Sequence, residues 1–172
     1  MNTVEIDKIM AVNSKIFTGT YACDELPSLN SLQSPCSMIL NDQPSTMPGN
    51  HWLLLYFEKN GHVIYFDSYG RPMLKVFQEY IGNQKCTKNN TQFQSIGSNY
   101  CGQYCILVAL YLESGMSMKA IESCFNDSPQ ENDQFISYWS ETELGYPDST
   151  CDDTKNIISL KTVQGCQCMA CA

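Results

Sequence analysis

A run of nine apolar residues, from Tyr104 to Leu112, places the strongest constraint on how this chain can fold. A helix that is apolar on every side must be buried among other elements rather than laid on a surface. The run is far shorter than the ~20 residues that a membrane span needs, so we expect no membrane partner. We predict a helix over residues 99–114, capped by Asn99 and ended by Gly115, in the middle of the fold.

A second apolar segment, from Trp52 to Phe57, predicts a strand that is buried on both faces and therefore central in a sheet. The turn signal Lys59-Asn60-Gly61 follows, and the chain then runs back as a partner strand that ends at Asp67. His51 precedes the first strand, so the hairpin brings His51 and Asp67 to the same end of the sheet. Side chains alternate between the faces of a strand, so these two share a face only if the loop has three residues. We predict that loop, with Gly61 in the left-handed conformation.

Weaker signals predict the other elements. Helices are expected over residues 4–12, 73–81, 118–125 and 129–139. The first is opened by Asn2 or Thr3, the second by Pro72 and the last by Ser128. Short strands are expected within 16–27, at 37–40 and near 91–94. The length fits one domain, which we place at residues 1–145. Residues 146–172 sustain no periodicity and are expected to be a disordered tail that contains Cys151, Cys166, Cys168 and Cys171.

The chain has ten cysteines in 172 residues, about 6%, which is less than the roughly 8–10% of a disulfide scaffold. The first ten residues include three charged side chains and no apolar stretch of the kind found in signal peptides. We therefore expect an intracellular, reducing environment and free thiols. The net charge of -8 would repel a phosphate backbone, so nucleic acid is not an expected partner.

Cys101 is the cysteine best placed for chemistry, because it falls in the first turn of the predicted buried helix. Unpaired backbone N–H groups and the positive end of the helix dipole both stabilise a thiolate there. A nucleophilic thiolate also needs a base and a group that orients the base, and His51 and Asp67 can supply them. Gln94, seven residues before Cys101, can donate to an oxyanion together with the Cys101 N–H. Cys105, one turn further along, is expected to be a packing residue.

Each of these residues also has an ordinary structural explanation when it is taken alone. An isolated helix cysteine is most often inert, His51 can be a cap or core histidine, and Asp67 can simply begin a turn. By composition Gln92 is as available as Gln94. His62 lies at the opposite end of the hairpin and is expected to be solvated.

The residues together resemble a known family. The segments are His51-Trp52, Asp67-Ser68-Tyr69-Gly70, Gln94 and Cys101-Gly102-Gln103-Tyr104-Cys105. In this order and spacing they resemble adenovirus protease (adenain) and its relatives, most closely the Maverick/Polinton-type proteases and more distantly the SUMO and ubiquitin-like-protein proteases. Phe17-Thr18-Gly19-Thr20-Tyr21 and Pro48-Gly49-Asn50 add to the Maverick/Polinton likeness, which covers residues 14 to about 140.

The resemblance implies an α+β fold: a papain-like cysteine protease scaffold with a mixed sheet and a buried nucleophile helix. It implies that Cys101 is the nucleophile, that His51 is the general base and acid, that Asp67 orients His51, and that Gln94 helps to form the oxyanion hole. Trp52 matches the aromatic residue that covers a narrow tunnel for a Gly-Gly tail in the SUMO proteases. Strand alternation instead places Trp52 on the sheet face opposite His51, where it would pack in the core.

The function that this resemblance implies is that of a cysteine endopeptidase. Its protein substrate would be the precursor of a viral or transposon structural protein, cleaved at Gly-containing sites. The resemblance places this activity in the nucleus or the virion. Two alternatives stay open: a deconjugase of SUMO or ubiquitin-like proteins, and a catalytically inactive binding module. We expect no cofactor and no metal, because the tail spacing Cys166-x-Cys168-x2-Cys171 is a weak match to a metal site. Adenain is activated by DNA and a short viral peptide; the acidic charge argues against DNA here, and no residue marks a peptide-activator site.

Overall fold

The computed structural model describes residues 1–145, and the predicted tail at 146–172 lies outside the described residues. Five strands form one mixed sheet in chain order: β1 (Phe17–Tyr21), β2 (Cys36–Asn41), β3 (Trp52–Phe57), β4 (Val63–Phe66) and β5 (Cys86–Lys88). The two outer pairs are parallel, and the two pairs that include β3 are antiparallel. The predicted α+β fold with a mixed sheet is therefore confirmed.

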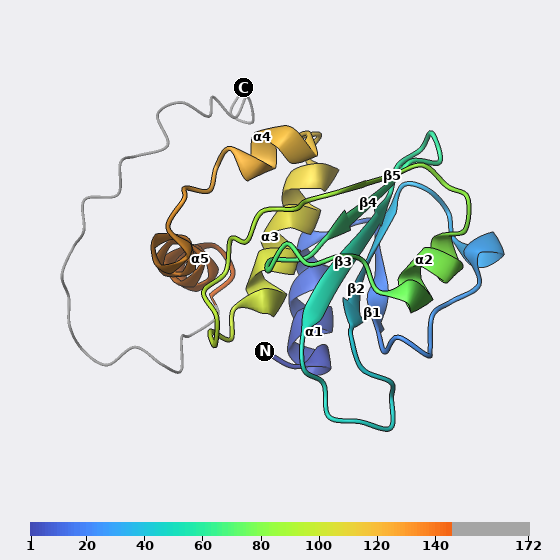
Figure 1. Ribbon diagram of the computed structural model, residues 1–172, viewed down its shortest axis with the longest axis horizontal. Coiled ribbons are helices and arrows are strands. Elements are labelled where there is room, and N and C mark those ends of the chain that lie inside the picture. The colour runs from blue at the N-terminus through green and yellow to red at the C-terminus, as the bar shows by residue number, and fades with distance from the viewer. Residues whose placement is uncertain (146–172) are drawn as a thin grey trace.

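Helices cover both faces of the sheet (Figure 1). One face carries α1 (Thr3–Asn13), α3 (Cys101–Glu113), α4 (Met118–Glu122) and α5 (Pro129–Glu143), and the other carries α2 (Lys75–Ile81) and a short 3-10 turn at Leu29–Ser31. The strand β3 contributes alternate side chains to the two resulting cores, with Trp52 and Leu54 facing α3 and Leu53 and Leu55 facing α2. All six residues of β3 are buried, which confirms the predicted central strand.

The apolar run forms the buried helix that the sequence predicts. Tyr104 through Ala109 are at most 1% exposed, because α3 packs against the sheet and is flanked by α1, α4 and α5. The predicted cap was wrong: the helix begins at Cys101, and Tyr100 occupies the N-cap position without a side-chain capping bond. The chain turns at Gly97 (φ 84°), bends at Asn99 and becomes helical only after Tyr100, so Cys101 is the first helical residue.

The hairpin has the predicted geometry. Leu54 lies opposite Phe66, and this register continues down to a three-residue loop at 59–61. Gly61 has a φ of 79°, the left-handed conformation that such a loop requires. Extended by one step, the same register puts Asp67 opposite Leu53, on the face that His51 also belongs to.

Several other elements differ from the sequence predictions, and the helix α5 extends to Glu143 rather than ending at Trp139. The helix α2 begins at Lys75 rather than Met73, because Leu74 is still extended and Met73 is buried in the core on that face. No strand forms at 91–94; the edge strand is β5, and Ser68 O accepts hydrogen bonds from the backbone N–H groups of residues 93 and 94. The helix α4 ends at Glu122 rather than at residue 125. The predicted caps Asn2 and Ser128 are confirmed by their side-chain hydrogen bonds.

No helix among residues 1–145 is both long enough and apolar enough to cross a membrane. The six cysteines in this part of the chain are free thiols.

Candidate active site

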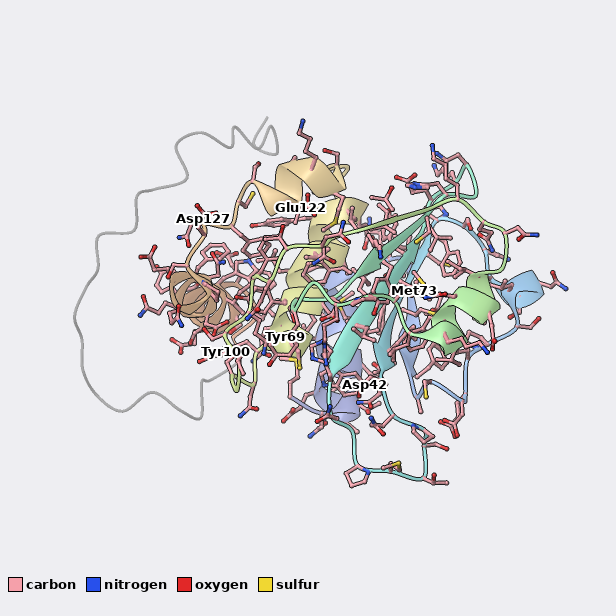
Figure 2. The ribbon with its side chains drawn as sticks, in the orientation of Figure 1. Asp42, Tyr69, Met73, Tyr100, Glu122 and Asp127 are labelled. Atoms are coloured by element: carbon pink, nitrogen blue, oxygen red, sulfur yellow. The ribbon has the colours of Figure 1, made fainter. Side chains whose placement is uncertain are left out.

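The side chains singled out in the sequence meet at the end of the sheet where β3 and α3 begin. A cleft of about 900 Å³ opens there, and His51, Trp52, Tyr69, Cys101 and Gln103 lie along it. Figure 2 shows Tyr69 and Tyr100 at this end of the molecule, far from Glu122 on α4. Segments more than 50 positions apart in the chain therefore share one cleft.

His51 and Asp67 form a buried pair. His51 Nε2 is 2.7 Å from Asp67 Oδ1, and the two side chains are 3% and 2% exposed. The backbone N–H of His51 donates to Asp42 Oδ1 at 3.1 Å, which fixes the start of β3. The predicted shared face of the hairpin is thus realised as a direct contact between the two side chains.

Asp67 is held on all sides by hydrogen-bond donors. Its Oδ1 also accepts the backbone N–H of Tyr69 at 2.8 Å, and its Oδ2 accepts Arg71 Nε at 3.2 Å. Asn89 binds the backbone of Asp67 from both directions, accepting its N–H at 3.0 Å and donating to its carbonyl at 2.6 Å. The carboxylate is therefore fixed in position before any substrate binds.

Cys101 lies beside His51 in the cleft, and its hydrogen bonding and charge raise the pKa of His51. Because Nε2 faces Asp67, Nδ1 is the ring nitrogen left for the thiol. Cys101 is the first residue of α3, where backbone N–H groups have no partner inside the helix. A thiol, an imidazole and a carboxylate thus lie in the order that the chemistry of a thiol hydrolase requires.

The electrostatics of the pair favour its charged form. Burial alone would lower the pKa of His51, but the hydrogen bonds and charges of Asp67 and Cys101 outweigh burial and raise that pKa to about 9. Burial would raise the pKa of Asp67, yet the hydrogen bond and charge of His51, the Tyr69 N–H and the Arg71 guanidinium hold it below its ordinary value. At neutral pH the site therefore holds an imidazolium beside a carboxylate.

Gln94 lies behind the loop that leads into α3. It is fully buried, its Oε1 accepts the Ser68 hydroxyl at 2.6 Å, and its Nε2 donates to Ser98 O at 2.8 Å and Ser98 Oγ at 2.9 Å. Both amide hydrogens are thus used within the protein. These bonds of Gln94 fix residues 95–98, the loop that precedes α3 and so sets the position of Cys101 relative to His51.

Trp52 lies at the junction of core and cleft. Its ring packs in the core that faces α3, as strand alternation predicts, and its Nε1 donates to Met1 O at 3.0 Å. It also lines the cleft beside Cys101, and a Cβ added to Gly102 would lie only 3.3 Å from its ring. The wall of the cleft next to Cys101 is therefore closely packed. A narrow passage for substrate beneath Trp52 stays a prediction.

The remaining predicted residues have structural roles. Cys105 is completely buried, and burial raises its pKa well above the ordinary value, as suits a packing residue. His62 bonds Glu58 and Thr87 at the far end of the hairpin. Among the described residues no cluster of His, Cys, Asp or Glu side chains is suited to hold a metal ion, and the tail cysteines lie outside them.

Sequence reasoning missed Asn89, Tyr69 and Arg71 as parts of the site. Tyr69 and Arg71 stand two and four residues after Asp67, and the turn after a candidate catalytic Asp is a signal that could have directed attention to them. Asn89 is 22 residues from Asp67 and in a loop, and no sequence pattern marks it.

The fold of residues 1–145 is that of a known protease. The chain resembles a crystal structure of the ASFV pS273R protease with a TM-score of 0.61 and 16% sequence identity, over 86% of this chain and 67% of that one. A second crystal structure of the same protease, with selenomethionine, gives a TM-score of 0.54 at 16% identity, over 79% of this chain and 66% of that one. This chain thus spans about two thirds of the length of that protease. No family model and no curated protein matches the sequence.

Proposed function

We propose that this protein is a cysteine endopeptidase whose catalytic unit lies in residues 1–145. The observation that carries the proposal is the buried Asp67–His51 hydrogen bond with the Cys101 thiol beside it, at the edge of a large cleft. The fold shared with the ASFV pS273R protease supports it independently of these side chains. An inactive binding module would have no need of a buried imidazolium–carboxylate pair beside a thiol at a helix start.

The proposed reaction has two steps. The Cys101 thiolate attacks the scissile carbonyl carbon, and the C–N bond breaks as the leaving amine takes a proton from His51, which leaves a thioester. His51 then removes a proton from water, and the resulting hydroxide attacks the thioester carbonyl and expels the thiolate with release of a carboxylic acid. Asp67 keeps Nε2–H of His51 bound throughout, so that Nδ1 faces the reacting atoms.

We assign the oxyanion hole to the backbone N–H of Cys101 and to Gln94. For Gln94 to donate to an oxyanion, one amide hydrogen must leave the Ser98 hydroxyl, and its second bond, to Ser98 O, can stay. Removal of one oxyanion donor costs roughly 10²- to 10³-fold in kcat.

We therefore expect Gln94→Ala to lower kcat by about 10²-fold or more. The control is Gln33→Ala, an exposed glutamine on the loop before β2 whose loss should change kcat by less than about threefold. Peptide hydrolysis and the melting temperature are measured together for both variants. A Gln94→Ala enzyme that folds like the wild type and keeps its kcat would remove Gln94 from the reaction.

The substrate class we propose is the precursor of a viral or transposon structural protein, cleaved where small residues such as glycine flank the scissile bond. The resemblance to adenain-type proteases suggests the precursor, and the close packing of Trp52 against Gly102 beside Cys101 favours small residues at the bond. Among the described residues that line the cleft, Glu25 is the one acidic side chain and none is Lys or Arg, which fits a protein substrate better than DNA.

The test is covalent capture followed by cleavage profiling. We expect a peptide vinyl sulfone ending in Gly-Gly to label one thiol, Cys101, at neutral pH, and a peptide library to be cut next to small residues. Vinyl sulfones of SUMO and ubiquitin serve as the comparison. Labelling by these and no cleavage of the library would make the protein a deconjugase, while no labelling by any probe would contradict the peptidase proposal.

A further inference from the structure

Four side chains at the active site form a closed ring of contacts. His51 Nε2 lies 2.7 Å from Asp67 Oδ1, and Arg71 Nε lies 3.2 Å from Asp67 Oδ2. The guanidinium carbon of Arg71 is 4.8 Å from the ring centroid of Tyr69. That same ring stacks on the imidazole of His51, with centroids 4.8 Å apart and planes inclined by 29°. Each of the four side chains therefore touches two of the others.

We propose that Tyr69 and Arg71 are positioning residues that hold the His51 ring and the Asp67 carboxylate in the orientation needed for proton transfer. This inference rests on the proposed function, because it takes His51 as the catalytic acid and base. Tyr69 and Arg71 act through His51 and Asp67, and neither is assigned a proton of its own to transfer.

Tyr69 makes three contacts around the imidazole of His51. Its ring covers one face of His51, and its backbone N–H binds the same Asp67 oxygen that His51 binds, at 2.8 Å. Its hydroxyl donates to Ser98 O at 3.4 Å, on the loop that enters α3. The stack thus fixes the plane of the His51 ring. In that plane one ring nitrogen faces Asp67 and the other faces Cys101. An aromatic face also favours a cation above it, so the stack stabilises the imidazolium.

Arg71 stops the carboxylate from rotating. Asp67 is 2% exposed while Arg71 is 49% exposed, so the guanidinium covers the second oxygen from the solvent side. With Oδ1 bound to His51 and Oδ2 bound to Arg71, neither oxygen can turn away without the loss of a charged hydrogen bond. The backbone supports this placement: Gly70 (φ 63°) sits so tightly on Thr91 that an added Cβ would lie 2.7 Å from the Thr91 backbone.

The ionisable groups around His51 show which of them governs its protonation. The groups that face it from the surrounding elements are Asp42, Tyr65, Asp67, Tyr69, Arg71 and Cys101. Asp42 uses its oxygens to accept the backbone N–H of His51 and the side-chain amide of Asn50. Asp67 is therefore the carboxylate that binds the imidazole itself, and its orientation governs the protonation of His51.

The chain offers a direct measurement, since it contains two histidines. The full chain is labelled with ¹³C at histidine Cε1, and the His62→Gln variant assigns the two signals in a pH titration. The variants are Tyr69→Phe, which keeps the stack; Tyr69→Leu, which removes it; and Arg71→Gln. The control is Lys75→Gln, an exposed cation in the next turn that pairs with Glu79 instead.

We expect the wild-type His51 signal to titrate near pH 9 and Lys75→Gln to match it, while Tyr69→Phe, which keeps the stack, should stay closer to the wild type than Tyr69→Leu. Tyr69→Leu and Arg71→Gln should titrate at least one pH unit lower and lose about 10- to 100-fold in kcat, with KM changed less than about threefold. The sign for Arg71→Gln is decisive: loss of a nearby cation by itself raises the pKa of His51, whereas a released Asp67 carboxylate lowers it.

The proposal is overturned if Arg71→Gln raises the His51 midpoint or leaves it unchanged, with kcat retained. It is also overturned if Tyr69→Leu titrates and turns over like the wild type. Arg71 is half exposed, so its variant decides the matter even if Tyr69→Leu does not fold. A wild-type chain with no peptidase activity would contradict the proposed function alone, because the titration midpoints still test the positioning of His51.

Discussion

We expect the Cys101→Ala variant to have no measurable peptide hydrolysis, a loss on the order of 10⁵- to 10⁶-fold in kcat. The proposed reaction has no nucleophile without this thiol, because Cys101 is the cysteine beside His51 at the start of α3. The fold should persist, since Cys101 is only partly buried and alanine suits the first turn of a helix.

Cys105→Ala is the matched control for this experiment. Cys105 lies one turn further along the same helix and is completely buried, so its loss should cost about 1 kcal/mol of stability by removal of one buried atom and leave kcat within about threefold of the wild type. Activity is followed with the peptide that the library profile selects, and folding by thermal denaturation. Full cleavage by Cys101→Ala, or loss confined to Cys105→Ala, would show that the nucleophile has been assigned to the wrong residue.

The second large effect is expected for Asp67→Asn. Loss of the carboxylate should lower kcat by about 10²- to 10⁴-fold, because an asparagine neither fixes the imidazole in the working tautomer nor balances its charge. It should also move the alkaline limb of the rate profile. In the wild type this limb should lie near pH 9, where His51 loses its proton. In the variant, burial lowers the pKa of His51 and only Cys101 still raises it, so the limb should fall below pH 9.

The same pair ties stability to pH, and the sign follows from the direction of each pKa change. The pKa of His51 is raised on folding, so its contribution is complete below about 6.5 and is lost as pH rises through about 9. The pKa of Asp67 is lowered on folding, so its contribution is present above its ordinary value of 3.8 and is lost as acid protonates it. The wild type should therefore melt at lower temperature at pH 9.5 than at pH 6, and Asp67→Asn should show a smaller difference. Asp127→Asn, an exposed aspartate on the loop before α5, is the control and should keep the wild-type difference.

The hairpin shows what the sequence can determine about a site. Side-chain alternation along a strand has a period of two, so once His51 and Asp67 are taken to share a face, their parity requires a three-residue loop ending at Gly61 rather than a two-residue turn. The apolar run behind Cys101 was equally informative, because a helix without a polar side can only lie in the core. These features depend on local geometry and on burial, which the order of residues records directly.

The contacts that the sequence did not reveal are between segments whose meeting depends on tertiary structure. Asn89 reaches Asp67 because β5 pairs with β4 and the following loop turns back, which no local pattern specifies. The start of α3 was placed too early for a similar reason: Asn99 is a good capping residue by type, but the turn at Gly97 and the Gln94–Ser98 contacts set where the helix begins. Side-chain stacking of Tyr69 on His51 likewise requires the three-dimensional course of the turn after β4.

The residues of the site are also synthesised in a fixed order. His51 and Asp67 are 16 residues apart in one hairpin, whereas Cys101 comes from a helix that is synthesised later and joins the sheet through long-range contacts. Local contacts form quickly, and contacts between distant segments are slow because the intervening chain must first be ordered. The proposed base and its carboxylate therefore precede the proposed nucleophile in the order of synthesis. In the proposed enzyme, the capacity to cut other proteins would require that α3 is packed against the sheet.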